Sequence, residues 1–148
     1  MGDETPWLDA DEGQLWRDWI HAQAAIELAV ARDLRQSAGL GHGEYEILAH
    51  LSESPDRRLR FGDLASLTGW ERSRASHQLA RMEKRGLVSR EDTPGDRRGS
   101  MVVLTDAGFQ AIQQAAPQHV RAVRAAFVDR LDEKERAVLA TVLRRLQE

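Results

Sequence analysis

The feature that most constrains the fold is a pair of helical segments separated by a glycine turn. The first segment covers about 62–67, and the sequence Thr68-Gly69-Trp70 that follows it is typical of a tight turn. The second covers about 72–85, and Gly86 suits its end. The residues expected to face inward on this second helix are Ala75, Leu79 and Met82. In this arrangement the first helix and the turn brace the second, whose other faces stay free.

A β-hairpin is predicted directly after the helix pair. Residues 87–92 and 101–104 are short alternating segments, and the loop at 93–100 is rich in turn-forming residues. Before the helix pair, residues 57–61 also alternate and suggest a single strand turn. Helix, turn, helix and hairpin in this order predict a winged helix-turn-helix lobe at about 43–105.

Long amphipathic segments flank this lobe. Apolar residues recur at steps of three and four from about 14 to 37, and again over two helices within about 106–147. Asp132 and Glu135 form a capping box before the last helix. The apolar stripes are broader than so small a lobe can cover, so a second copy of the chain is expected to bury them.

The expected fold is therefore mainly α with a small β-hairpin wing, a winged helix-turn-helix with N- and C-terminal dimerisation helices. A chain of 148 residues has the length of one domain, which we place at 14–148. Residues 1–13 are acidic and lack helical periodicity, so they are expected to form a flexible arm.

The charge of the chain is unevenly distributed. The net charge is −3, but residues 57–98 contain eleven Arg and Lys against six Asp and Glu. The rest of the chain contains ten basic and eighteen acidic residues. A basic middle between acidic flanks favours a DNA-binding face on a soluble body, although a chance cluster on a solvated surface would give the same count.

Several classes of protein are disfavoured by what the sequence lacks. No cysteine is present, which excludes disulfides, a thiolate nucleophile and a cysteine zinc site. There is no apolar run long enough for a transmembrane helix, and the acidic N-terminus does not look like a signal peptide, so a cytoplasmic location is expected. The histidines are scattered, and Ser76 and His77 are adjacent, so they point in different directions on a helix. We therefore expect no metal, no cofactor and no enzyme activity.

The free faces of the 72–85 helix carry small polar and basic side chains that can reach base edges in a major groove. These residues are Arg72, Ser73, Arg74, Ser76, His77, Gln78 and Arg81. In the hairpin loop, Arg97 and Arg98 can enter a narrow, electronegative minor groove. The alternative for each of these residues is an ordinary solvated surface position.

Two stretches resemble the MarR family of bacterial regulators. Asp96-Arg97-Arg98-Gly99-Ser100-Met101-Val102-Val103-Leu104-Thr105 fits the family's wing pattern, D-x-R followed by five residues and L-T. Residues 79–88 look like the family's junction between recognition helix and wing, and the order of elements matches from about Gln14 to the end. One departure is Glu71 near the start of the recognition helix, where a serine-like cap would be more comfortable.

The resemblance implies roles for individual residues. Arg98 matches the motif arginine of the wing, Arg97 is the other candidate for the minor groove, and Asp96 would pair with a wing arginine. The part of the recognition helix that usually meets bases would consist of Ser73, Arg74, Ser76, His77 and Gln78. The family's dimer forms from the N-terminal helix and the last two helices, in agreement with the broad apolar stripes.

The resemblance also implies a function. The chain would bind double-stranded DNA as a homodimer, repress transcription at a pseudopalindromic operator, and be released by a small lipophilic or phenolic effector. Trp19, Tyr45 and His50 are candidates for lining the effector pocket. The alternative is a winged-helix module that binds other proteins and has no operator of its own.

Overall fold

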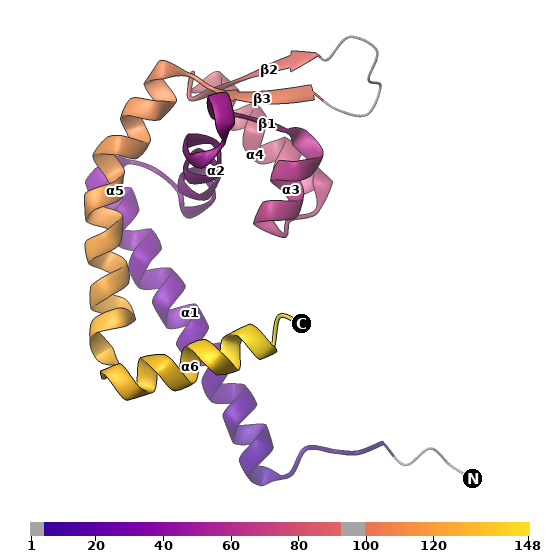
Figure 1. Ribbon diagram of the computed structural model, residues 1–148, viewed down its shortest axis with the longest axis vertical. Coiled ribbons are helices and arrows are strands. Elements are labelled where there is room, and N and C mark those ends of the chain that lie inside the picture. Colours follow the sequence, from indigo (N-terminus) through magenta and orange to yellow (C-terminus); the bar gives the residue numbers. More distant parts are fainter. Residues whose placement is uncertain (1–4, 93–99) are drawn as a thin grey trace.

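The computed structural model describes residues 5–92 and 100–148, which form helices and one small sheet (Figure 1). The helices are α1 (Ala10–Ala38), α2 (His42–Glu53), α3 (Phe61–Thr68), α4 (Arg72–Lys84), α5 (Asp106–Ala126) and α6 (Glu133–Arg145). The strands are β1 (Arg58–Arg60), β2 (Val88–Asp92) and β3 (Ser100–Leu104), with 3-10 turns at Pro55–Arg57 and Val128–Arg130. The predicted fold class, mainly α with a small β wing, is confirmed.

Helix α1 begins at Ala10 rather than near residue 14. The Asp9 carboxylate accepts a hydrogen bond from the N–H of Glu12 at 2.8 Å, and the Glu12 carboxylate accepts one from the N–H of Asp9 at 3.0 Å. This capping box starts the helix before its apolar stripe begins. The prediction that all of residues 1–13 form a flexible arm is therefore wrong for residues 10–13.

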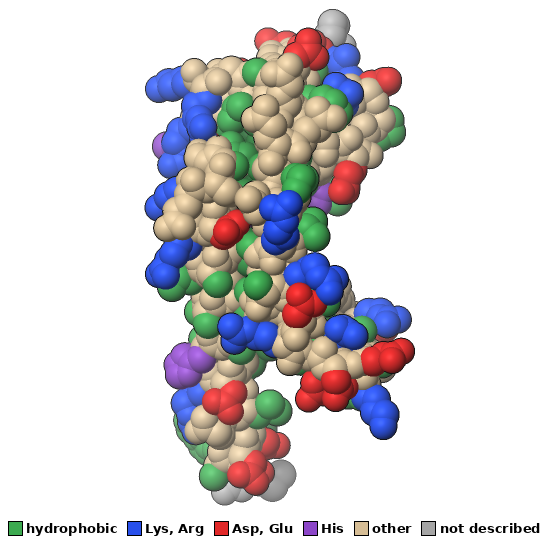
Figure 2. Space-filling model, turned by 90° about the vertical axis from the view of Figure 1, so that its left-hand side faces the viewer, with side chains coloured by type: hydrophobic (Ala, Val, Ile, Leu, Met, Phe, Trp, Pro, Cys, Tyr) green, Lys and Arg blue, Asp and Glu red, His purple; other side chains and the backbone are tan. Residues whose placement is uncertain are grey.

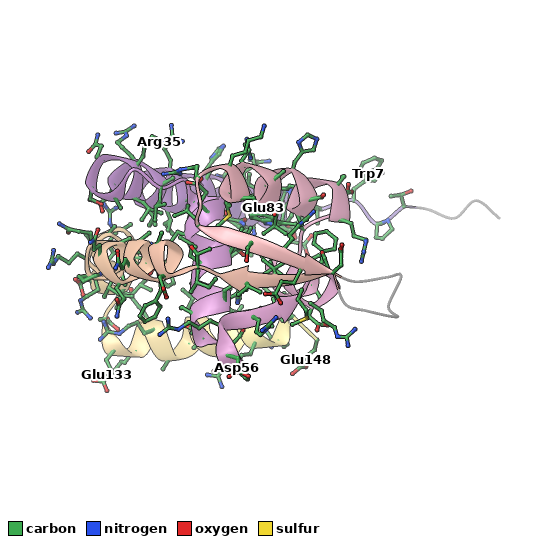
Figure 3. All side chains as sticks on the ribbon, turned by 90° about the horizontal axis from the view of Figure 1, so that it is seen from above. Trp7, Arg35, Asp56, Glu83, Glu133 and Glu148 are labelled. Atoms are coloured by element: carbon green, nitrogen blue, oxygen red, sulfur yellow. The ribbon has the colours of Figure 1, made fainter. Side chains whose placement is uncertain are left out.

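The sheet has three antiparallel strands in the order β1-β3-β2. The predicted hairpin pairs β2 with β3, with Val88 opposite Leu104, and Figure 3 shows these two strands side by side. Strand β1 adds to the other edge of β3, with Leu59 opposite Val102. The segment expected to be a single strand turn is thus an edge strand that joins the start of α3 to the base of the wing.

Helix α2 lies at the centre of the lobe. Its residues Ile47, Leu48 and Leu51 are completely buried, as is Leu79 of α4. Leu34 of α1 and residues of α5 belong to the same apolar cluster. The lobe and the long helices therefore share one core, so α4 is held in a fixed place relative to α1 and α5.

The long helices form an extended body below the lobe. Helices α1 and α5 lie side by side, and in the view of Figure 1 α6 passes in front of α1. Within the described chain, no residue of α6 is buried. Figure 2 shows apolar side chains at the surface of this body, and the exposed ones include Leu15, Trp16, Leu28, Val138 and Leu146.

Candidate nucleic-acid interface

A left-handed glycine sets the angle between α3 and α4. Gly69 adopts φ 67°, a conformation that costs glycine little, and so ends α3. The N–H of the next residue, Trp70, donates to the Ala65 carbonyl at 3.2 Å. Helix α4 then begins at Arg72, and the side chain of Glu71 makes no capping hydrogen bond. Glu71 thus leaves α4 without a side-chain cap, as its residue type suggested. The helix nevertheless begins at the predicted position, Arg72.

Helix α4 turns one face inward and the other outward. Ala75, Leu79 and Met82 are at most 1% exposed, as the periodicity predicted. On the outer faces, Arg72, Ser73, Arg74, His77 and Arg81 are exposed, and Ser76 and Gln78 are half-buried. All seven residues proposed for the recognition helix thus lie outside the buried stripe of α4.

Aromatic rings contact two arginines of α4, Arg72 and Arg74. The guanidinium carbon of Arg72 lies 4.8 Å from the ring centre of Phe61, and that of Arg74 lies 4.3 Å from the ring centre of Trp70. Arg90 of β2 approaches Phe61 from the wing side, at 5.2 Å. Sequence reasoning missed the roles of Phe61 and Trp70, because an aromatic residue near a turn is usually read as core.

A hydrogen bond joins two further candidates on α4. The Arg81 guanidinium donates to Oε1 of Gln78 at 2.6 Å. The Gln78 amide keeps its N–H donors, which in a major groove suit the acceptors of adenine or guanine. Gln78 and Arg81 are therefore a coupled pair rather than two independent contacts.

The base of the wing is braced by charged side chains. Arg58 of β1 forms an ion pair with Glu91 of β2, across the intervening strand β3. Nε of Arg90 is buried without a hydrogen-bond partner. The three residues predicted at the wing loop, Asp96, Arg97 and Arg98, lie outside the described residues, so their roles stay predictions.

Arg85, just after α4, has a structural role. Its Nη1 donates to both carboxylate oxygens of Glu44 at 2.6 Å, and its Nη2 donates to the Gly39 carbonyl at 3.3 Å. Glu44 is 8% exposed and also accepts from the N–H of Gly41 at 2.8 Å. Arg85 therefore ties the end of α4 to the α1–α2 junction.

We expect Arg85→Ala to lower the free energy of unfolding by about 1–3 kcal/mol, since it removes charge-assisted hydrogen bonds from a buried carboxylate. Denaturant titration at fixed protein concentration measures this loss. Arg124→Ala is the matched control, because it breaks a surface ion pair with Asp129 that is worth about 0–1 kcal/mol. Equal losses in the two variants would show that Arg85 does not brace α4.

The three residues proposed for an effector pocket do not form one group. The ring of Tyr45 stacks on His119 of α5, with 3.9 Å between ring centres. Burial, and secondarily Glu53, raises the pKa of Tyr45. Burial and then His42 lower the pKa of His119, while Asp33 acts in the opposite direction. His50 lies in the last turn of α2, where its carbonyl accepts from the Ser54 hydroxyl at 2.6 Å.

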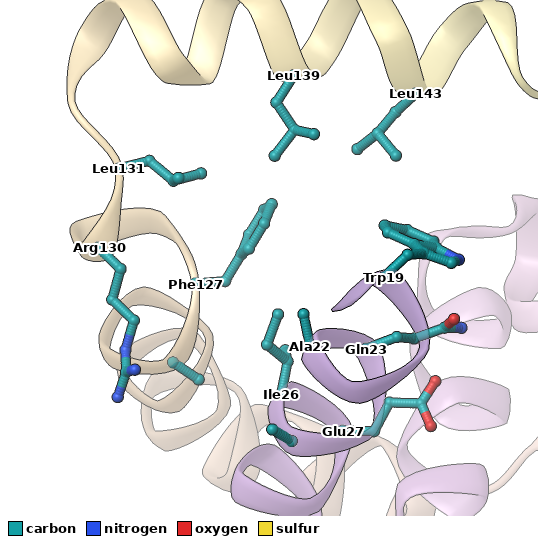
Figure 4. Close-up of a pocket in the computed structure, with 12 residues that line it drawn as sticks. Trp19, Ala22, Gln23, Ile26, Glu27, Phe127, Arg130, Leu131, Leu139 and Leu143 are labelled. Atoms are coloured by element: carbon teal, nitrogen blue, oxygen red, sulfur yellow. The ribbon is translucent and has the colours of Figure 1, made fainter. Parts of the chain in front are cut away.

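Trp19 instead lines an apolar hollow of about 550 Å³ between α1, the end of α5 and α6. In Figure 4, Trp19 and Ile26 of α1 face Phe127, Leu139 and Leu143 across this hollow. The Tyr45–His119 pair, by contrast, lies where α2 meets α5. Near it, Oδ2 of Asp33 and Nδ1 of His119 are buried without hydrogen-bond partners.

Two kinds of feature are absent from the described residues. None of the helices in residues 5–92 and 100–148 is long and apolar enough to cross a membrane. In the same ranges, no three His, Asp or Glu side chains are grouped as metal ligands would be.

Comparison with known proteins identifies close relatives. The model of the MarR family matches residues 38–99. The chain is 44% identical to Sco3205, a MarR family transcriptional regulator from Streptomyces coelicolor whose crystal structure is in complex with DNA. The match covers 99% of this chain and 92% of Sco3205, with a TM-score of 0.92.

Two further structures are similar. AbsC, a MarR family transcriptional regulator from Streptomyces coelicolor, is 38% identical, with coverage of 97% of this chain and 96% of AbsC and a TM-score of 0.89. The organohalide-sensing regulator RdhR-CbdbA1625, solved with 2,4-dichlorophenol bound, is 22% identical and has a TM-score of 0.81. That match covers 99% of this chain and 85% of the other and shows the fold alone.

Proposed function

Because the chain belongs to the MarR family of transcriptional regulators, we propose that it binds duplex DNA in a sequence-specific manner and represses transcription. One observation carries this proposal: α4 buries its apolar face in the lobe and leaves Arg72 and Arg74 exposed, with Gln78 half-buried beside them. A helix presented in this way fits a major groove, where arginine pairs with guanine and glutamine with adenine. A protein that acts on DNA in this way would work in the bacterial cytoplasm.

The acting form is a homodimer in this proposal. Helix α6 buries none of its described residues, and large apolar side chains of α1 and α6 are exposed. A second copy would cover these faces and place two α4 helices on the same side of the DNA. The operator would then be a pseudopalindrome with half-sites about 10 bp apart.

In this proposal, a small lipophilic or phenolic effector controls DNA binding by the protein. The apolar hollow beside Trp19 and the unpaired polar atoms near Tyr45 and His119 are the two places that could receive it. A bound dichlorophenol in a relative of the same fold supports this chemistry. Such an effector acts only by binding the DNA-competent and DNA-incompetent arrangements of the dimer with different affinity.

The alternative is a protein-binding module without an operator. The net charge of −3 and the uncapped start of α4 at Glu71 favour it, whereas the outward arginines of α4 do not.

The salt dependence of binding to mixed-sequence duplex DNA separates the two functions. A DNA-binding regulator releases counterions, so its affinity should fall steeply between about 50 and 200 mM salt. The double variant Arg72→Ala/Arg74→Ala removes two positive charges from α4 and should weaken binding at the lower salt concentration, while Arg121→Ala, which removes an exposed charge from α5, should leave it unchanged. No measurable binding at the lower salt concentration would favour the protein-binding module.

For the wing, we expect the double variant Arg97→Ala/Arg98→Ala to weaken operator binding, most at operators with A·T-rich flanks. Loss of two positive charges from the DNA interface would also make the affinity fall less steeply with salt. Fluorescence anisotropy with operators that differ only in their flanks measures both effects. If the double variant binds as tightly as the parent protein, the wing is not part of the DNA interface.

A further inference from the structure

Trp70, between α3 and α4, is held from two sides. Its backbone is fixed by the hydrogen bond from its N–H to Ala65, directly after the left-handed Gly69. Its indole ring lies against the first turn of α2, at Gly43. A Cβ built on Gly43 would lie 2.7 Å from Cη2 and 3.2 Å from Cζ2 of the ring. The ring therefore occupies space that any side chain at position 43 would need.

Arg74, in the first turn of α4, lies four residues after Trp70 and folds back over this ring. Side chains in a helix lean toward its N-terminus, so Arg74, in the first turn of α4, is directed back toward Trp70, which lies just before the helix. The guanidinium carbon is 4.3 Å from the ring centre, within the range of a cation–π contact. Arg74 is nevertheless exposed, so the contact leaves its edge open to a ligand.

We propose that Trp70 is a positioning residue that fixes the guanidinium of Arg74 for contact with DNA, and that Gly43 is needed for the ring to take this place. An unrestrained arginine loses much rotamer freedom when it binds a base. A guanidinium already lying on an immobile ring loses less, so the same base contact yields higher affinity. This inference rests on the proposed DNA-binding function and specifies how one contact of α4 is prepared.

If Trp70 only stabilised the fold, its replacement would have a different effect on DNA binding. The ring also packs against the core of the lobe, so its removal could weaken binding simply by loosening α4. That loss would not depend on the residue at position 74. A positioning role, in contrast, disappears once Arg74 is absent.

A double-mutant cycle separates the two roles. The probe is a duplex enriched on the parent protein from random-sequence DNA, and the variants are Trp70→Leu, Trp70→Phe and Gly43→Ala, each with Arg74 and with Arg74→Ala. With Arg74 present, Trp70→Leu and Gly43→Ala should weaken binding about fivefold, and Trp70→Phe, which keeps a ring, should recover most of this. In the Arg74→Ala background, none of the three should have a further effect.

Equal losses with and without Arg74 would overturn the inference while leaving DNA binding intact. Failure of the parent protein to enrich any duplex would overturn the proposed function, and the inference with it. Should Trp70→Leu fail to fold, Gly43→Ala and Trp70→Phe still complete the cycle. A measurement without DNA adds an independent check: the order parameter of the Arg74 side chain by NMR should exceed about 0.6 in the free protein, and a lower value would contradict the inference.

Discussion

Replacement of Gly108 with alanine is expected to lower the free energy of unfolding by about 3 kcal/mol, even though alanine is the better helix former. Gly108 lies in the first turn of α5, and a Cβ built there would be 2.1 Å from the Leu87 carbonyl oxygen and 2.7 Å from Cδ1 of Leu104. The carbonyl belongs to the backbone, so no rotamer change can relieve the clash.

The same clash should separate the wing from α5. The Leu87 carbonyl also accepts the N–H of Thr105 at 3.2 Å, and the Thr105 hydroxyl donates to the Gly86 carbonyl at 2.6 Å. Any shift that makes room for the new methyl group must therefore disturb the junction of α4, the wing and α5. We expect Gly108→Ala to lose DNA affinity as well as stability.

Denaturant unfolding at fixed protein concentration measures the stability loss. Gly13→Ala provides the control, because Gly13 also lies in a helix but its Cβ would meet only the end of the Arg17 side chain, at 3.4 Å. That variant should be about as stable as the parent or more stable by up to about 1 kcal/mol. A Gly108→Ala protein that unfolds at the same denaturant concentration as the parent would show that α5 does not dock as described.

Arg74→Ala is expected to reduce affinity for the operator by about 1–3 kcal/mol, roughly 5- to 150-fold, and to relax the choice of one base. Arg74 is exposed, carries a full charge and is held on Trp70 near the start of α4, the part of a recognition helix that meets base edges. Affinity should fall most for the cognate base pair and little for operators already changed at that position.

Anisotropy titrations against operators with every base pair at each half-site position measure this loss of discrimination. Gln78→Ala should relax a different position and should also release Arg81, its hydrogen-bond partner. Arg121→Ala removes the same charge from α5 and should leave base preference unchanged. If Arg74→Ala weakened binding to all duplexes by one common factor, Arg74 would be a phosphate contact rather than a reader of bases.

Local sequence signals predicted much of this architecture. Three features depend only on residues close together in the sequence: the turn at Gly69, the alternation of 101–104 and the inward stripe of α4. Each could therefore be predicted from a short stretch of sequence. The capping box of Asp9 and Glu12 is equally local, but it was missed because no apolar stripe accompanies it. Helix bounds set by caps rather than by apolar residues are easily misplaced.

Contacts between distant residues could not be read in this way. Glu44 and Arg85 are 41 positions apart, and β1 is separated from its partner β3 by α3, α4 and β2 in the sequence. Trp70 and Arg74 are only four residues apart, yet the ring of Trp70 packs against Gly43 of α2, about 27 positions earlier in the chain. Sequence therefore predicted which side chains lie on the α4 surface, but not which of them are held in place.

Selection of binding sites from random duplex DNA tests the central claim most directly. The purified protein is used to enrich bound duplexes over several rounds, and the enriched pool is sequenced. A dimeric regulator that reads DNA through α4 should enrich a pseudopalindrome with half-sites about 10 bp apart, and binding to it should weaken steeply with salt. A pool that stays random, with no binding at moderate salt, would contradict the account.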